Sequence, residues 1–334
     1  MTAVTTIAHP NIALIKYWGK RDASLNLPAA GSLSVTLGPM HTRTTVSWGH
    51  EATAVTLNGA DVTAARSGRE MTAFLELIKE ANDAHGSRAL GEAHVLTEND
   101  FPTAAGLASS SSGYAALALG ATKAAGLELD EQALSVLARR GSGSASRSVA
   151  GGVVEMRPGE REDGTDANAV QVFSGDHWDL RVVVALTTRG AKDVASRDGM
   201  NQTAATSPYF TAWVDTVAPA LIEAKAAIAE RDFARLALAA EASAMQMHAS
   251  AIASVPGVLY WNAATVAVIH AVRRWRGQGV PAFFTIDAGP HVKIFTLAGH
   301  EDALAARVRE LPGVLGVLHA APADGARVVP LDAA

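Results

Sequence analysis

The feature that most constrains the fold of this chain is residues 99–114, which read NDFPTAAGLASSSSGY. Pro102 fixes its own φ and biases the residue before it toward extended backbone, while Gly106 and Gly113 permit close approach to a ligand. The four serines are poor helix formers whose hydroxyls are expected to be free for anion or metal contact, and small apolar residues of high helix propensity follow them. Because a glycine-rich turn that leads into a helix presents unpaired N–H groups to an anion, we predict a phosphate-binding loop here.

This loop matches neither of the common phosphate-binding motifs. The chain contains no Gly-Lys-Ser or Gly-Lys-Thr, as Walker A requires, and no G-x-G-x-x-G. A flexible linker is the alternative, because glycine and serine runs are commonly linkers. A linker would not be bounded by Phe-Pro-Thr on one side and an apolar helix on the other.

A second unusual segment covers residues 139–148, RRGSGSASRS. Gly141 and Gly143 allow the backbone to approach a ligand, and Arg147 carries the planar guanidinium that pairs with carboxylate or phosphate. The alternative is a helix C-cap followed by a surface turn, and the residues alone leave both possibilities open.

Two further side chains are candidates for chemistry. Lys16 follows four apolar residues, so we expect it at a strand end near the core, where it needs an anionic partner or loses its charge. Asp287 ends an apolar strand before Ala-Gly-Pro and could accept a proton from a substrate hydroxyl. Its alternative role is to form a turn through its own backbone.

Composition excludes several classes of function. The 334 residues are 49% hydrophobic and 18% charged, which predicts a sizeable core and one or two domains. A net charge of -5 argues against a nucleic-acid partner, and zero cysteines exclude disulfides and thiolate sites. No H-E-x-x-H, G-x-S-x-G, signal peptide or membrane-length apolar stretch is visible. We therefore expect a soluble, cytoplasmic protein.

Hydrophobic periodicity predicts an α+β chain of two domains, residues 1–180 and 181–334. We expect a hairpin turn at Asn58-Gly59, a loop over 192–200, and Val266 on the buried face of a helix opened by Asn262. The other expected strands cover 32–37, 42–48, 93–97, 151–156, 180–187, 281–286, 292–297 and 314–319. The other expected helices cover 71–83, a stretch ending near 126, 131–140 with Asp130 as its N-cap, 220–231 with Pro219 in its first turn, 233–247 with Asp232 as its N-cap, and 301–311.

Four segments together resemble the mevalonate diphosphate decarboxylase family of the galactokinase–homoserine kinase–mevalonate kinase–phosphomevalonate kinase (GHMP) superfamily. They are NIALIKYWGKRD at 11–22, FPTAAGLASS at 101–110, RGSGSASRS at 140–148 and FTIDAGP at 284–290. The strings KYWGK and DAGP are specific to the decarboxylase branch, whereas the glycine–serine loop indicates only the superfamily. Ser146 occupies the position before Arg147 at which some relatives have a cysteine. A small hydroxyl in place of a thiol puts little of the resemblance in doubt.

The resemblance implies a GHMP-kinase-like fold, with a ribosomal-protein-S5-like N-terminal domain, a ferredoxin-like C-terminal domain and the active site between them. It implies ATP-dependent decarboxylation of mevalonate 5-diphosphate to isopentenyl diphosphate, through phosphorylation of the 3-hydroxyl, with ATP and Mg²⁺ as cofactors. A homodimer is expected from the resemblance alone.

The resemblance also assigns roles to residues of this sequence. Asp287, Lys16 and Arg147 are expected to be catalytic, with Arg147 also holding the substrate carboxylate. The remaining substrate contacts are expected from Tyr17, Lys20, Ser142, Ser144 and Arg197. ATP phosphates are expected to contact Ala104, Ala105, Gly106, Leu107, Ala108, Ser109, Ser110, Lys192 and Ser196. Ser109 or Ser110 is the expected Mg²⁺ contact.

Three alternatives remain open from the sequence. Two keep the fold and change the reaction, namely a phosphomevalonate decarboxylase and a mevalonate 3-kinase. The third is a non-catalytic nucleotide-binding homologue. Lys16, Arg147 and Asp287 together favour decarboxylation, and ADP release with and without mevalonate 5-diphosphate separates these alternatives.

Overall fold

Two mixed helix-and-sheet units make up the computed structural model, which describes residues 3–84, 86, 89–101, 109–190 and 192–331. In the first unit, the alternation of buried and more exposed residues along β6 is typical of a sheet with one covered face. The strand order of its sheet is β16 (Arg327–Val329), β1 (Val4–Ala8), β6 (Thr42–His50), β9 (Glu92–Asn99), β7 (Ala54–Leu57) and β8 (Ala60–Asp61).

The second sheet runs through the middle of the molecule. Every residue of its strand β5 is buried, because helices and loops cover both faces. Its order is β11 (Ala169–Phe173), β10 (Val153–Met156), β5 (Ser32–Gly38), β15 (Gly316–Pro322), β12 (Leu180–Leu186), β14 (Val292–Leu297) and β13 (Ala282–Thr285), with β2 (Asn11–Ile15) beside β5. A short ribbon pairs β3 (Lys20–Asp22) with β4 (Leu27–Pro28).

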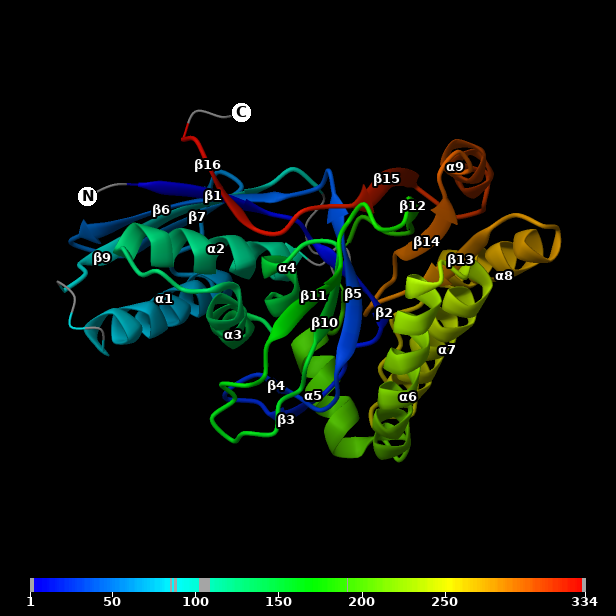
Figure 1. Cartoon of the computed structure of the whole chain (residues 1–334), viewed down its shortest axis with the longest axis horizontal. Coiled ribbons are helices and arrows are strands. Elements are labelled where there is room, and N and C mark those ends of the chain that lie inside the picture. The colour runs from blue at the N-terminus through cyan, green and yellow to red at the C-terminus, as the bar shows by residue number, and fades with distance from the viewer. Residues whose placement is uncertain (1–2, 85, 87–88, 102–108, 191, 332–334) are drawn as a thin grey trace.

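Helices cover both sheets and enclose separate cores (Figure 1). The helices are α1 (Arg66–Ala84), α2 (Ser109–Ala125), α3 (Glu131–Gly141), α4 (Ser146–Val149), α5 (Ser196–Thr206), α6 (Phe210–Ala229), α7 (Phe233–Ile252), α8 (Ala263–Gly277) and α9 (Glu301–Arg309). Helices α1 and α2 pack against the first sheet and α3 packs against α2, whereas α6 and α7 lie side by side against the second sheet. No described helix is long and apolar enough to cross a membrane.

The last strands return the chain to its beginning. Strand β15 pairs with β12 and β5, and β16 then pairs with β1 in the first sheet. The second sheet therefore joins strands from both sides of the predicted division at 180/181, and that division stays a prediction. The predicted two-domain α+β fold is confirmed.

Several sequence predictions of local structure hold. The hairpin turn at Asn58-Gly59 connects β7 to β8. Asp130 and Asp232 cap α3 and α7 through their carboxylates, and Asn262 forms a capping box at α8.

Three predictions are wrong, in each case because tertiary packing outweighs a local preference. Pro219 lies inside α6, which begins nine residues earlier at Phe210 and carries a buried stripe that includes Trp213. The segment expected as a loop contains α5, whose Met200 is buried. Val266 is 40% exposed, and the core face of α8 instead carries residues such as Val268.

Candidate active site

One cavity of about 770 Å³ gathers every predicted site residue that the structure describes. Its walls come from the end of β2, the starts of α1, α2 and α5, the segment before α4 and the turn after β13. The predicted residues that line it are Lys16, Tyr17, Lys20, Ser109, Ser110, Ser142, Ser144, Arg147, Lys192, Ser196, Arg197 and Asp287. Ala104, Ala105, Gly106, Leu107 and Ala108 lie outside the described residues.

Lys16 has the anionic partner that its buried position was expected to require, and that partner is Asp287. Lys16 Nζ donates to Asp287 Oδ1 at 2.7 Å and to the Ala13 carbonyl at 2.7 Å. The lysine side chain is 1% exposed and the aspartate side chain 29% exposed, so the carboxylate reaches the cavity from a largely dry wall. This ion pair bridges the end of β2 and the turn that follows β13.

Charge around Asp287 keeps it ionised. Burial acts to raise the pKa of the carboxyl, but the ammonium groups of Lys16 and Lys293 outweigh burial and hold that pKa below its usual value. Burial lowers the pKa of Lys16, and the attraction of Asp287 opposes this. Burial, with repulsion from Lys16 and Lys192, lowers the pKa of Lys293 to about 8, against the attraction of Asp287.

Arg147 is held by neutral groups, and no carboxylate in the described part of the chain is bonded to it. Its Nε donates to Ser34 Oγ at 3.1 Å, Nη1 to Ser32 Oγ at 2.8 Å and Nη2 to Asn11 Oδ1 at 3.3 Å. The residue is 2% exposed yet lines the cavity. A buried guanidinium without an acidic partner can receive an anionic ligand.

Tyr17 and the serines form the wall beside Arg147. The Tyr17 hydroxyl is buried and has no hydrogen-bond partner among the residues that the structure describes, and burial raises its pKa to about 12. A Cβ at Gly143 would approach this hydroxyl to 2.1 Å, so only glycine fits at that position. Ser142 and Ser144 place their hydroxyl oxygens 3.2 Å apart on the same wall.

Two further cations extend the cavity away from Asp287. Lys20 Nζ donates to Asn26 Oδ1 at 2.5 Å, and burial, with repulsion from Arg197, lowers the pKa of Lys20 to about 8. Arg197 donates to Glu70 Oε1 at 3.2 Å and to the Gly141 carbonyl at 3.4 Å. The partners of Lys20 and Arg197 are neutral or partly exposed groups. An anionic ligand of higher charge can therefore replace these partners.

The start of α2 forms another part of the cavity wall. Ser109 and Ser110 open this helix and line the cavity, as the predicted phosphate-binding role requires. The expectation that all four serine hydroxyls are free is wrong. Ser111 Oγ accepts from the backbone N–H of Asn11 at 3.4 Å, and Ser112 Oγ lies 2.6 Å from Thr42 Oγ1. Lys192 Nζ donates to Ser196 Oγ at 2.8 Å, and both residues line the same cavity.

Oxygen donors are the only candidates for a metal site in this cavity. No group of three or more His, Cys, Asp or Glu side chains among the described residues could hold a metal ion. The hydroxyls of Ser109 and Ser110 fit Mg²⁺, which prefers oxygen ligands and commonly arrives with nucleotide phosphates.

Comparison with known proteins decides the family. Residues 8–169 match the diphosphomevalonate decarboxylase-like N-terminal domain, and residues 182–315 match the mevalonate 5-diphosphate decarboxylase C-terminal domain. The chain belongs to the mevalonate diphosphate decarboxylase family. The diphosphomevalonate decarboxylase mvd1 of Aspergillus fumigatus is 38% identical over 92% of this chain and 80% of its own length.

Solved structures of this decarboxylase family share the whole fold. The crystal structure of mevalonate diphosphate decarboxylase from Staphylococcus aureus aligns with a TM-score of 0.90 at 34% identity, covering 98% of each chain. A structure described as MDDEF in complex with MVAPP, AMPPCP and magnesium aligns with a TM-score of 0.89 at 36% identity, also over 98% of each chain.

Sequence reasoning missed several residues of this decarboxylase-family cavity. Asn11 was visible only as the first residue of a strand motif, yet its amide bonds Arg147 and the Ser144 carbonyl. Nothing in the sequence distinguishes Arg66 and Glu70 from the ordinary charged residues of a helix, although both line the cavity and bond each other. Lys293 lies in an apolar strand, where its position beside Asp287 could not be read from spacing.

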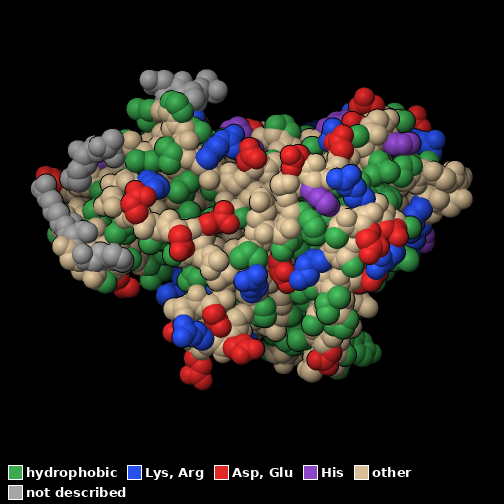
Figure 2. All heavy atoms as spheres, viewed as in Figure 1, with side chains coloured by type: hydrophobic (Ala, Val, Ile, Leu, Met, Phe, Trp, Pro, Cys, Tyr) green, Lys and Arg blue, Asp and Glu red, His purple; other side chains and the backbone are tan. Residues whose placement is uncertain are grey.

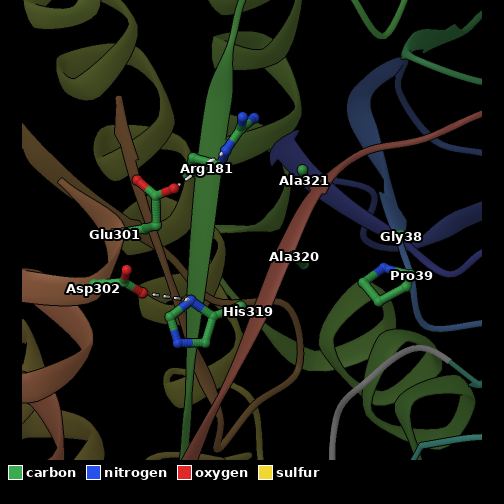
Figure 3. Close-up of a pocket in the computed structure, with 8 residues that line it drawn as sticks. All are labelled: Gly38, Pro39, Arg181, Glu301, Asp302, His319, Ala320 and Ala321. Atoms are coloured by element: carbon green, nitrogen blue, oxygen red, sulfur yellow. Dashed lines mark ion pairs between the residues drawn. The ribbon is translucent and has the colours of Figure 1, made fainter. Parts of the chain in front are cut away.

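A smaller cavity of about 270 Å³ lies outside this site, between β5, β12, β15 and α9 (Figure 3). Arg181 pairs there with Glu301 at 3.5 Å, and His319 approaches Asp302 at 3.9 Å. None of the predicted site residues lines it.

Proposed function

We propose that this chain catalyses the ATP-dependent decarboxylation of mevalonate 5-diphosphate to isopentenyl diphosphate, with release of ADP, phosphate and carbon dioxide. The observation that carries the proposal is the convergence of the Lys16–Asp287 pair and Arg147 in one cavity of about 770 Å³. Family membership and the relative bound to MVAPP, AMPPCP and magnesium support the same reaction.

Asp287 is the proposed acid–base residue at the 3-hydroxyl. A tertiary alcohol is a crowded nucleophile, so placing its oxygen in line with the γ-phosphorus of ATP matters more than full deprotonation. The ionised carboxylate accepts the hydroxyl proton as the O3–P bond forms and ADP leaves. Lys16 keeps this carboxylate charged and fixes its direction.

Arg147 is proposed to hold the substrate carboxylate through the second step. There the C3–O bond breaks and phosphate leaves, while the C1–C2 bond breaks and its electron pair forms the C2–C3 double bond as carbon dioxide departs. The guanidinium must orient the carboxylate without retaining its electrons. Its neutral partners Ser32, Ser34 and Asn11 fix its plane and leave its charge available to the substrate.

The remaining cavity residues are proposed to hold the two phosphate-bearing molecules. Tyr17, Lys20, Ser142, Ser144 and Arg197 bind the 5-diphosphate. Residues 104–110, with Lys192 and Ser196, bind the ATP phosphates, and Ser109 or Ser110 contacts Mg²⁺. The metal supplies charge neutralisation on the β- and γ-phosphates during transfer.

The direct test measures ADP, phosphate and carbon dioxide with purified protein, ATP and Mg²⁺. We expect all three products in equal amounts with mevalonate 5-diphosphate and a background rate without it. Mevalonate 5-phosphate serves as the matched substrate, and faster turnover on it would make the chain a phosphomevalonate decarboxylase. ADP without carbon dioxide would make it a 3-kinase, and no ADP at all would leave a nucleotide-binding homologue.

A cytoplasmic location and a homodimer complete the proposal. The homodimer is expected from the family resemblance alone, and a cytoplasmic location would give the chain access to ATP and a diphosphorylated substrate. Sedimentation of the purified chain tests the dimer, and a mass equal to the 34.5 kDa monomer at micromolar concentration would reject it.

A further inference from the structure

Helix α7 contacts both strands that carry the Lys16–Asp287 pair. It packs against β2, which ends just before Lys16, and against β13, which leads to Asp287. These strands lie far apart in the sequence, and Figure 1 shows α7 beside both. A single rigid helix can therefore set the position of one partner of the ion pair relative to the other.

Ser243 connects α7 to the lysine. Its hydroxyl accepts the backbone N–H of Lys16 at 3.0 Å, and the serine is 3% exposed. Lys16 follows the last residue of β2, so this amide lies beyond the strand and its buried N–H needs another acceptor. Ser243 therefore fixes the backbone from which the ammonium group reaches Asp287.

His248 connects the same helix to the aspartate. It is 1% exposed, and its ring lies 4.8 Å from the ring of Trp261. Burial, with repulsion from Lys16, lowers its pKa to about 3 against the effect of hydrogen bonding to the backbone of Ile286 and Asp287. The imidazole is therefore neutral at physiological pH, and it contacts the turn that aims the carboxylate.

Glu241 adds a third connection on the β13 side. Its carboxylate accepts the Phe284 amide at 3.3 Å and is itself held by Arg276 at 3.0 Å. Strand β13 is also tied to β2 directly, since Thr285 Oγ1 donates to the Ala13 carbonyl that accepts Lys16 Nζ. Together these contacts restrain the pair from both sides.

We propose that Ser243 and His248 are positioning residues for catalysis, which hold Lys16 and Asp287 in register through α7. Neither touches the substrate; each acts on the backbone of a residue that does. The proposal rests on the proposed function, because only a reaction at Asp287 makes its placement matter for rate.

Ser243→Ala is the first test, because alanine is the best helix former and keeps α7 intact. Ser250→Ala is the matched control, since Ser250 is equally buried on the same helix and its hydroxyl has no partner among the described residues. We expect Ser243→Ala to lower kcat about tenfold, because misplacement of a catalytic group costs rate, and to change KM less than twofold. Ser250→Ala is expected to match wild type.

The pH profile separates positioning from a merely structural role. Asp287 faces Lys16 from β2, Lys293 from β14, Lys192 near α5, Arg147 from α4 and neutral His248 from α7. A Lys16 side chain that is less firmly positioned stabilises the Asp287 carboxylate less, so the pKa of Asp287 rises. The acid limb of the kcat/KM profile therefore moves to higher pH in Ser243→Ala, by about half a pH unit. An unshifted limb, or a kcat equal to that of Ser250→Ala, overturns the proposal for Ser243.

A pair of substitutions tests His248. His248→Asn retains a side-chain donor, and we expect its kcat to stay within threefold of wild type. His248→Phe keeps a ring against Trp261 and removes the donor, and we expect about a tenfold loss of kcat with little change in KM. Equal rates for the two variants, at equal melting temperatures, overturn the role of His248. Wild type that releases no ADP with mevalonate 5-diphosphate would instead refute the proposed function.

Discussion

The two ends of the cavity are built differently. At the proposed reaction end, Lys16 is 1% exposed and is held by Asp287 and the Ala13 carbonyl, and Arg147 is 2% exposed and bonded to buried neutral side chains. At the proposed diphosphate end, Lys20 is partly exposed, and the Arg197 side chain is 40% exposed and bonded to Glu70. One end has fixed partners and the other has partners that a ligand can replace.

This difference follows from what each end has to do. Groups that stabilise a transition state must be placed before the substrate arrives, and burial makes their charges act strongly on one another. Groups that capture an anion from water can stay hydrated and exchange partners. Figure 2 shows basic and acidic side chains mixed across the visible face, whereas several lysines and arginines gather along the cavity wall. Mutations at the two ends should therefore alter different kinetic constants.

Asp287→Asn gives the largest expected effect. The substitution keeps the shape of the side chain and removes the base, so kcat should fall about 10²- to 10⁴-fold. KM should move far less, because the substrate is held mainly through its diphosphate and carboxylate. Steady-state kinetics with mevalonate 5-diphosphate measure both constants.

The turn-forming alternative for Asp287 predicts the opposite pattern. Loss of a turn hydrogen bond would lower the melting temperature and leave turnover nearly normal. A kcat within about threefold of wild type is smaller than a general-base effect and would remove Asp287 from the mechanism.

Arg147→Lys is expected to have the next largest effect, with Arg139→Lys as its control. Lysine cannot satisfy Ser34, Ser32 and Asn11 together, so kcat/KM should fall about 10- to 100-fold, as loss of charged hydrogen bonds implies. Arg139 is also fully buried, but its guanidinium donates to the carbonyls of Leu25, Gly164 and Ala167.

The control therefore separates a functional arginine from a structural one. Arg139→Lys should lower the free energy of unfolding by about 1–3 kcal/mol and leave kcat/KM within about threefold of wild type. Kinetics and denaturant unfolding on both variants make the comparison. Equal kinetic losses in the two would mean that Arg147 merely supports the fold.

The arginine pair also shows how far sequence reasoning reaches. Both lie in the segment 139–148 with the same local character, and nothing in its composition tells a ligand-facing guanidinium from one that faces backbone carbonyls. The family motif identified Arg147, and the structure explains it through Ser32, Ser34 and Asn11, which come from strands more than a hundred residues earlier.

Local signals predicted the parts of the fold that depend on local chemistry. The aspartate and asparagine caps, the Asn58-Gly59 turn and the alternating strand β6 are examples. Strand β16 and the pairing of β15 with β5 were missed, because they depend on where the chain end returns. Pro219 was misplaced for a similar reason, since a buried stripe on α6 outweighs the cost of an internal proline.

Substitutions at the diphosphate end should change KM rather than kcat. Arg197→Gln should raise KM about tenfold through loss of one charge-assisted hydrogen bond to the diphosphate. Glu70→Gln should act in the opposite direction and lower KM by up to about fivefold, because the exposed ion pair that competes for Arg197 is removed. If Glu70→Gln instead raises KM, the carboxylate supports Arg197 and does not compete with the ligand.

The smallest expected effect is the pH dependence of capture at Lys20. Burial and Arg197 lower the pKa of this lysine to about 8, so its charge is present below pH 8 and is lost as the pH rises through that value. Loss of the Lys20 charge should reduce kcat/KM about threefold to fivefold, in addition to any fall caused by other groups that lose a proton in this pH range.

Lys293, whose pKa is also lowered to about 8, lies beside Asp287 and could produce a similar fall in kcat/KM. Lys20→Arg distinguishes the two, because arginine stays charged in this range. If Lys20 captures the diphosphate, the KM of Lys20→Arg should stay nearly constant from pH 7 to 9, whereas the KM of the wild type should rise. If KM depends on pH in the same way in both proteins, the titrating group lies at the reaction end.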